Sequence, residues 1–115
     1  MRRDMELIKL LLQEVEGDEP KPDLSGYSEE AVLYHYELLE EAGLVIGHFT
    51  RGGGGRVVAA RIERLTNLGH DFLDAARSDT IWQKFRARAA RVGGSLSIPM
   101  AVELLKALVR ESLKL

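Results

Sequence analysis

The sequence predicts a mostly helical α+β domain in which a β-hairpin follows the second helix. Apolar residues recur at steps of three and four in several segments, which is the period of an amphipathic helix. Four consecutive glycines, Gly52–Gly55, join two apolar stretches in the manner of a flexible hairpin tip. The chain has 115 residues, 45% of them hydrophobic, and no cysteine. These values predict one globular domain that needs no disulfide.

The first predicted helix covers Met5–Val15, whose apolar residues form one stripe. Gly17 ends it. The next segment contains Pro20 and Pro22, and each proline disfavours helix at the residue before it. Gly26 closes this segment, so we expect a loop there instead of a short helix.

A second helix begins after Ser28, whose hydroxyl is a good N-cap. Its first turn is acidic, which suits the positive end of the helix dipole. Gly43 is in the position of a C′ glycine, and Leu44 can pack back on the helix. The hairpin then runs over Val45–Leu65.

Two or three further helices follow the hairpin. One begins at Thr66 or Asn67, and a break near Ser78-Asp79 would start another, which ends at Gly93-Gly94. Ser97 caps the last one. We expect Trp82 to lie in the core. The chain is then one domain, 1–115, with a core of about 4–77 and a C-terminal helical extension of about 79–115.

A helix that ends in Gly43-Leu44-Val45 and is followed by a basic hairpin is typical of a winged helix, in which the hairpin is the wing. Most winged-helix regulators also have a short support helix before the recognition helix. The prolines between Gly17 and Tyr27 predict that this support helix is lost or reduced to a turn.

Three separated motifs agree in order and spacing with a known pattern. They are Arg2-Arg3-Asp4-Met5-Glu6-Leu7-Ile8, Tyr34-His35 with Leu38-Leu39-Glu40-Glu41-Ala42-Gly43-Leu44, and Leu65-Thr66-x-x-Gly69-His70-Asp71-Phe72-Leu73-Asp74. These motifs resemble domain of unknown function 2513, a small bacterial and prophage-associated family. The resemblance implies a winged-helix-like fold and a bacterial or phage source, and it implies no established activity. More distantly, the strings Leu-Leu-Glu-Glu-Ala-Gly-Leu-Val and Leu-Thr-x-x-Gly are similar to those of winged-helix transcription regulators.

Charge is divided between the two halves of the chain. Residues 1–50 hold twelve acids and four bases, whereas residues 51–115 hold twelve bases and six acids. This polarity indicates an anionic partner for the second half, or self-association in which opposite charges meet, although both sets would also simply solvate helix faces.

Nucleic-acid binding is the first functional hypothesis. Four arginines bracket the glycine tip, and arginines on a thin hairpin can reach phosphates or a minor groove. The second helix is a poor base reader because it carries five glutamates and no cation. Further cations at Arg77, Lys84, Arg86, Arg88 and Arg91 would extend the patch. The predicted nucleic-acid-binding residues are Arg51, Arg56, Arg61 and Arg64.

Protein interaction is the alternative hypothesis. The acidic helix 28–42 would complement a basic partner, such as a host factor bound by a phage accessory protein. The apolar face of the last helix predicts a homodimer in either case. The predicted partner-binding residues are Glu29, Glu30, Glu37, Glu40 and Glu41.

We do not expect an enzyme, a metal or a cofactor. His35, His48 and His70 do not have the spacing of metal ligands. The glycine tip is followed by Arg56 and a strand, whereas a phosphate-binding P-loop needs Lys-Ser/Thr and a helix. Apolar runs are far shorter than the ~20 residues that span a bilayer. We therefore expect a cytoplasmic protein.

Overall fold

The structure is a computed structural model that describes residues 2–93 and 96–114. Within these residues it contains helices and one antiparallel hairpin, so the predicted mostly helical α+β class is confirmed. Helix α4 ends one residue before Gly93, as predicted, while Gly94 lies outside the described residues. The elements are α1 (Met5–Glu16), α2 (Glu29–Glu41), β1 (Val45–Arg51), a short 3-10 turn η1 (Gly53–Gly55), β2 (Val57–Leu65), α3 (Asn67–Ala76), α4 (Asp79–Val92) and α5 (Ile98–Ser112).

The helix starts lie where the sequence predicts them because each has a side-chain cap. The hydroxyls of Ser28, Thr66, Ser78 and Ser97 each accept a hydrogen bond from the backbone N–H three residues later. Asp4 does the same for α1. Such caps satisfy N–H groups that have no partner within the helix.

The end of α2 and the loop before it also follow the prediction. Gly43 has a φ of +79°, its N–H donates to Glu40, and the N–H of Leu44 donates to Leu39. These two hydrogen bonds form a Schellman motif, which needs a left-handed backbone conformation at the residue in the position of Gly43. Residues 17–28 contain no helix, so the segment that would hold a support helix is a loop.

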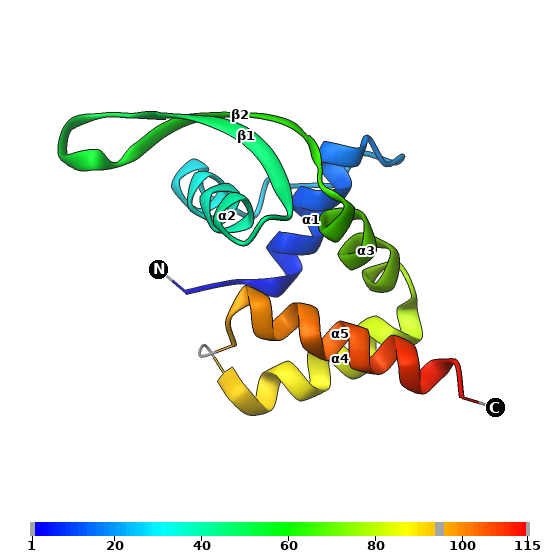
Figure 1. Cartoon of the computed structure of the whole chain (residues 1–115). Helices are drawn as coiled ribbons and strands as arrows, with labels where there is room; N and C mark the ends of the chain where they lie inside the picture. Colours follow the sequence, from blue (N-terminus) through cyan, green and yellow to red (C-terminus); the bar gives the residue numbers. More distant parts are fainter. Residues whose placement is uncertain (1, 94–95, 115) are drawn as a thin grey trace.

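The elements are arranged in three levels around α1 (Figure 1). The hairpin arches over α2, and its tip extends past that helix. Helices α4 and α5 lie side by side and antiparallel on the opposite side of the molecule. Helix α3 leads from the hairpin down to this pair.

The core runs through the whole molecule. Leu7, Ile8, Leu11 and Leu12 of α1 are all fully buried, and they belong to one core cluster that also contains buried residues of α2, α3, α4 and α5. Trp82 is 4% exposed and stacks on Phe85, so its predicted place in the core is confirmed. Phe85, Ile98, Ala101, Val102, Leu105 and Leu108 continue the core between α4 and α5.

The base of the hairpin is fixed by contacts between two of the sequence motifs. The hydroxyl of Thr66 donates to the carbonyl of Gly43 at 2.6 Å, and the N–H of Thr66 donates to the carbonyl of Leu44 at 2.9 Å. A Cβ on Gly69 would lie 2.1 Å from that Leu44 carbonyl oxygen. Only glycine therefore allows α3 to start so close to the end of α2.

Candidate nucleic-acid interface

The two faces of the hairpin differ because side chains alternate along each strand. The pairs Gly47↔Ile62 and Phe49↔Ala60 are only partly exposed and lie on the inner face, toward α2. The pairs Ile46↔Arg64 and His48↔Arg61 consist of exposed residues and form the outer face. Arg51, Arg61 and Arg64 can therefore be placed by their positions in this register, whereas Arg56 lies outside it, just before β2.

Arg51 is held against α2. It follows Val45, Gly47 and Phe49 at steps of two, which places it on the inner face. Its guanidinium donates to the Glu37 carboxylate at 2.5 Å and to the carbonyl of Gly55. Two of its donors are thus engaged inside the molecule, so this arginine is less available than the sequence suggests.

The other three predicted arginines are exposed. Arg56 follows η1 at the hairpin tip, and Arg61 lies on the outer face. Arg64 is also on the outer face and donates to the carbonyl of Leu65. None of the three forms an ion pair with any carboxylate in the described part of the chain.

One carboxylate lies between these outer arginines. Glu63 accepts a hydrogen bond from His48 at 2.8 Å. This bond and the charge of a protonated His48 hold the pKa of Glu63 below its usual range, and the charges of Arg61 and Arg64 lower it further. Glu63 is thus an exposed anion that offsets part of the positive charge of the outer face.

The acidic residues of α2 divide into two groups. Glu37 is partly buried and binds Arg51. Glu29, Glu30, Glu40 and Glu41 are exposed at the two ends of the helix, and within the described residues they form no ion pair. The structure therefore gives the predicted partner-binding set four free carboxylates and one that is already engaged.

A second basic surface lies on α4. Lys84, Arg88 and Arg91 are exposed at helical steps of four and three, so they share one face. Arg88 approaches Glu111 at 3.7 Å, while Arg86 and Arg77 are paired with Glu6 and Asp18 respectively. Figure 1 places α4 on the other side of the molecule from the hairpin, so these cations do not extend the hairpin patch. Sequence reasoning missed this separation because it depends on tertiary packing.

His35 and His70 each connect two elements of the fold. His35 is buried, and its ring lies between the backbone N–H of Asp4 and the carbonyl oxygen of Ala31, at 2.8 Å from each. His70 contacts Glu16 of α1 at 3.2 Å. Within residues 2–93 and 96–114, no three acidic or imidazole side chains gather in a way that could hold a metal ion. Among the same residues, no helix is both long enough and apolar enough to cross a membrane.

These features define a helical α+β domain with a long arginine-bearing hairpin packed over an acidic helix. The family model described as Hypothetical protein (DUF2513) matches residues 2–95, and the chain belongs to this family. This confirms the resemblance seen in the three sequence motifs. A protein of Haemophilus influenzae with the name "Uncharacterized protein" is 28% identical over 119 residues, which cover 98% of this chain and 99% of that relative. No solved structure matches the chain.

Proposed function

We propose that the protein binds nucleic acid through its phosphate backbone, with the outer face and tip of the hairpin as the contact surface. The observation that supports this proposal is the exposure of Arg56, Arg61 and Arg64 without carboxylate partners among the described residues. Guanidinium groups bind phosphate oxygens in a bidentate manner, and a thin hairpin can follow a groove edge. Regulation of phage or bacterial transcription is the biological role that fits a small nucleic-acid-binding domain of this kind.

The proposed mode differs from that of a typical winged helix. We infer that α1, α2 and the hairpin correspond to a winged helix whose support helix is a loop. Helix α2 would then stand in the place of the recognition helix. Its exposed glutamates would be repelled by phosphates, and the hairpin lies over it. Binding would therefore depend on backbone contacts and on groove shape, with little direct reading of bases.

The test compares two variants with matched loss of charge. One is Arg56→Ala with Arg61→Ala, on the hairpin, and the control is Lys84→Ala with Arg91→Ala, on α4. Binding to a labelled DNA duplex is measured by fluorescence anisotropy over a range of salt concentrations. Each lost phosphate contact should lower the salt slope by roughly 0.9.

The hairpin variant is expected to bind more weakly and to lose about two units of salt slope, while the α4 variant keeps both values. A larger loss in the α4 variant would move the contact surface to α4. The absence of any binding by the unchanged protein at low salt would overturn the proposed function.

A second candidate function is the binding of a basic protein partner by α2. It is favoured by the four exposed glutamates, which no cation of the described chain neutralises. An arginine-rich peptide titrated into the labelled protein should then shift the NMR signals of α2. Charge reversal by Glu29→Lys with Glu30→Lys should abolish these shifts. Shifts that persist in this variant would exclude α2 as the binding surface.

A further inference from the structure

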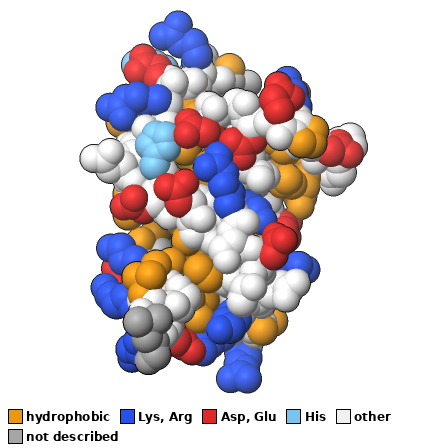
Figure 2. Space-filling view, turned by 90° about the vertical axis from the view of Figure 1, so that its right-hand side faces the viewer, with side chains coloured by type: hydrophobic (Ala, Val, Ile, Leu, Met, Phe, Trp, Pro, Cys, Tyr) orange, Lys and Arg blue, Asp and Glu red, His pale blue; other side chains and the backbone are white. Residues whose placement is uncertain are grey.

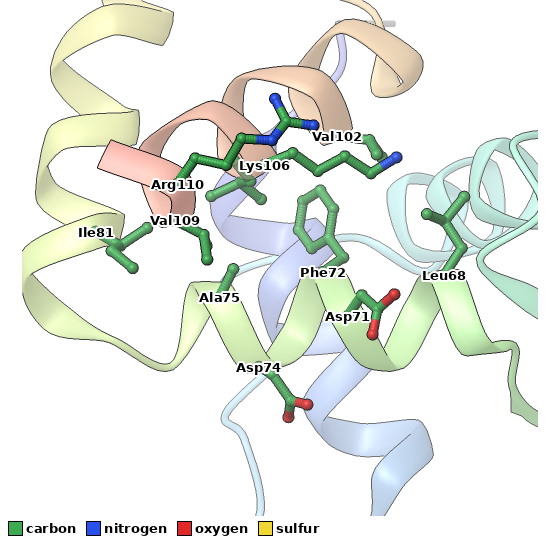
Figure 3. Close-up of a pocket in the computed structure, with 11 residues that line it drawn as sticks. Leu68, Asp71, Phe72, Asp74, Ala75, Ile81, Val102, Lys106, Val109 and Arg110 are labelled. Atoms are coloured by element: carbon green, nitrogen blue, oxygen red, sulfur yellow. The ribbon is translucent and has the colours of Figure 1, made fainter. Parts of the chain in front are cut away.

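An apolar groove of about 490 Å³ lies between α3 and α5, away from the hairpin and from the acidic helix. Figure 3 shows its side chains converging from α3, from α5 and from the start of α4. The apolar residues of the groove include Leu68, Phe72, Ala75, Ile81, Val102 and Val109.

The two lips of the groove carry opposite charges. Lys106 and Arg110 lie one turn apart on α5, and Figure 3 shows their side chains extending along that lip. Asp71 and Asp74 belong to the α3 lip. Within the described residues, the side chains of Asp71 and Arg110 form no hydrogen bond or ion pair. Among the same residues, the side chain of Lys106 pairs only with Glu103, and that of Asp74 pairs only with Arg77.

An exposed apolar side chain follows the groove along α5. Leu113 comes four residues after Val109, so it continues the side of the helix that lines the groove. It is 73% exposed, more than any other large hydrophobic side chain of the described chain. Figure 2 views the molecule from the side of the C-terminus and shows hydrophobic side chains gathered in the lower half, with charged ones around them.

We propose that this groove is the interface of a two-fold symmetric homodimer. In such an interface the same face meets itself. When the two-fold axis runs along the groove, the acidic lip of one copy lies on the basic lip of the other, and the converse pair forms at the same time. A face with one acidic and one basic lip is therefore complementary to itself. The proposed packing would also cover Leu113 against the apolar groove of the second copy.

A second copy explains more of these observations than a small ligand does. A ligand with an apolar body and an acidic head would use the groove and its cations. It would leave Asp71 without a partner and Leu113 exposed. The dimer uses both lips and the exposed leucine, and it does so without any molecule other than this chain.

The experiment uses two variants with reversed charge, Asp71→Lys and Arg110→Glu. Neither side chain forms a hydrogen bond or ion pair within the described monomer, so neither change removes one. Each variant alone places like charges opposite each other across the proposed two-fold interface. Like-charge contacts of this kind weaken association. The mass of each protein is measured by sedimentation equilibrium and by native mass spectrometry, without nucleic acid.

The unchanged protein should be a dimer at micromolar concentration, and each variant should dissociate at least about tenfold more readily. An equimolar mixture of the two variants should form a heterodimer, because the side chain introduced by Asp71→Lys in one copy then faces the one introduced by Arg110→Glu in the other. The chain that carries both changes should dimerise again. The control Arg91→Glu, on α4, should leave the dimer unchanged.

Three results would overturn the proposal. The unchanged protein could be monomeric at high concentration, both variants could dimerise as well as the unchanged protein, or the mixture could fail to form the heterodimer. A monomer that takes up a fluorescent anionic amphiphile, and loses this uptake with Arg110→Glu, would assign the groove to a small ligand. Nucleic acid takes no part in this measurement of the oligomeric state. A monomeric protein would therefore not contradict the proposal for the hairpin, and a protein that binds no DNA would not contradict the proposed dimer.

Discussion

The side chain of His35 joins the start of the chain to α2, and its substitution tests how much the two hydrogen bonds of this side chain contribute to the stability of the fold. It is 1% exposed. Its Nε2 lies 2.8 Å from the backbone N of Asp4, and its Nδ1 lies 2.8 Å from the carbonyl oxygen of Ala31. A backbone N–H can only donate, so Nε2 is the acceptor and Nδ1 carries the hydrogen. The ring thus accepts one hydrogen bond at Nε2 and donates one at Nδ1.

Substitution of His35 by alanine removes both hydrogen bonds and leaves the N–H of Asp4 without its partner. An orphaned donor costs about 1–3 kcal/mol, and the cavity left by a buried ring adds about 1–2 kcal/mol. We expect His35→Ala to lower the free energy of unfolding by roughly 2–5 kcal/mol. His35→Gln should cost less than His35→Asn, because the longer amide can reach Asp4 and accept from it.

Urea denaturation, followed by the fluorescence of the single tryptophan, Trp82, measures these differences. The reasoning is refuted if His35→Ala costs less than about 1 kcal/mol. It is also refuted if His35→Asn is as stable as His35→Gln, since the bond to Asp4 would then not be the important one.

Three further predictions follow from single contacts. Gly69→Ala should destabilise the protein by about 1–3 kcal/mol in urea denaturation, because its Cβ would meet a backbone carbonyl oxygen at 2.1 Å; a neutral effect would contradict the close approach. Burial and the bond to Glu14 raise the pKa of Tyr36, so the native state keeps this proton above pH 10 while the unfolded state loses it. Stability should therefore fall as the pH rises above about 10, and Tyr36→Phe should flatten this fall; unchanged steepness would count against it. Glu37→Gln should release Arg51 and raise the affinity for DNA in the anisotropy assay, whereas lower affinity would oppose the proposed role of the hairpin.

The sequence predicts the elements well because their signals are local. The hydroxyl of Ser28 accepts from the N–H of Ala31, and that of Ser78 accepts from the N–H of Ile81. Such a cap can satisfy a free N–H group at a helix start in almost any tertiary context. The left-handed conformation at Gly43 is also a local requirement. These features depend on residues within one turn, and the structure confirms them.

The details of the candidate interface depend on how elements pack, which composition does not reveal. The position of Arg51 is an exception, because the sequence contains a pattern that predicts it. It lies two residues after Phe49, on the same side of the strand, and the apolar character of Phe49 already identifies the inner face. By contrast, no local pattern shows that the cations of α4 lie on the other side of the molecule from the hairpin.

The motifs that carry the family resemblance have structural roles in this protein. Asp4 caps α1 and donates to His35, which links the first motif to the second. Thr66 donates to Gly43, which links the third motif to the second. These residues fix where the hairpin leaves the core and at what distance α3 follows. The groove lies only partly within the matched residues, since Asp71 is part of the third motif and Arg110 lies beyond residue 95. The charge-reversal pair thus asks whether a motif position whose side chain forms no hydrogen bond or ion pair within the described monomer is used in the contact between two copies.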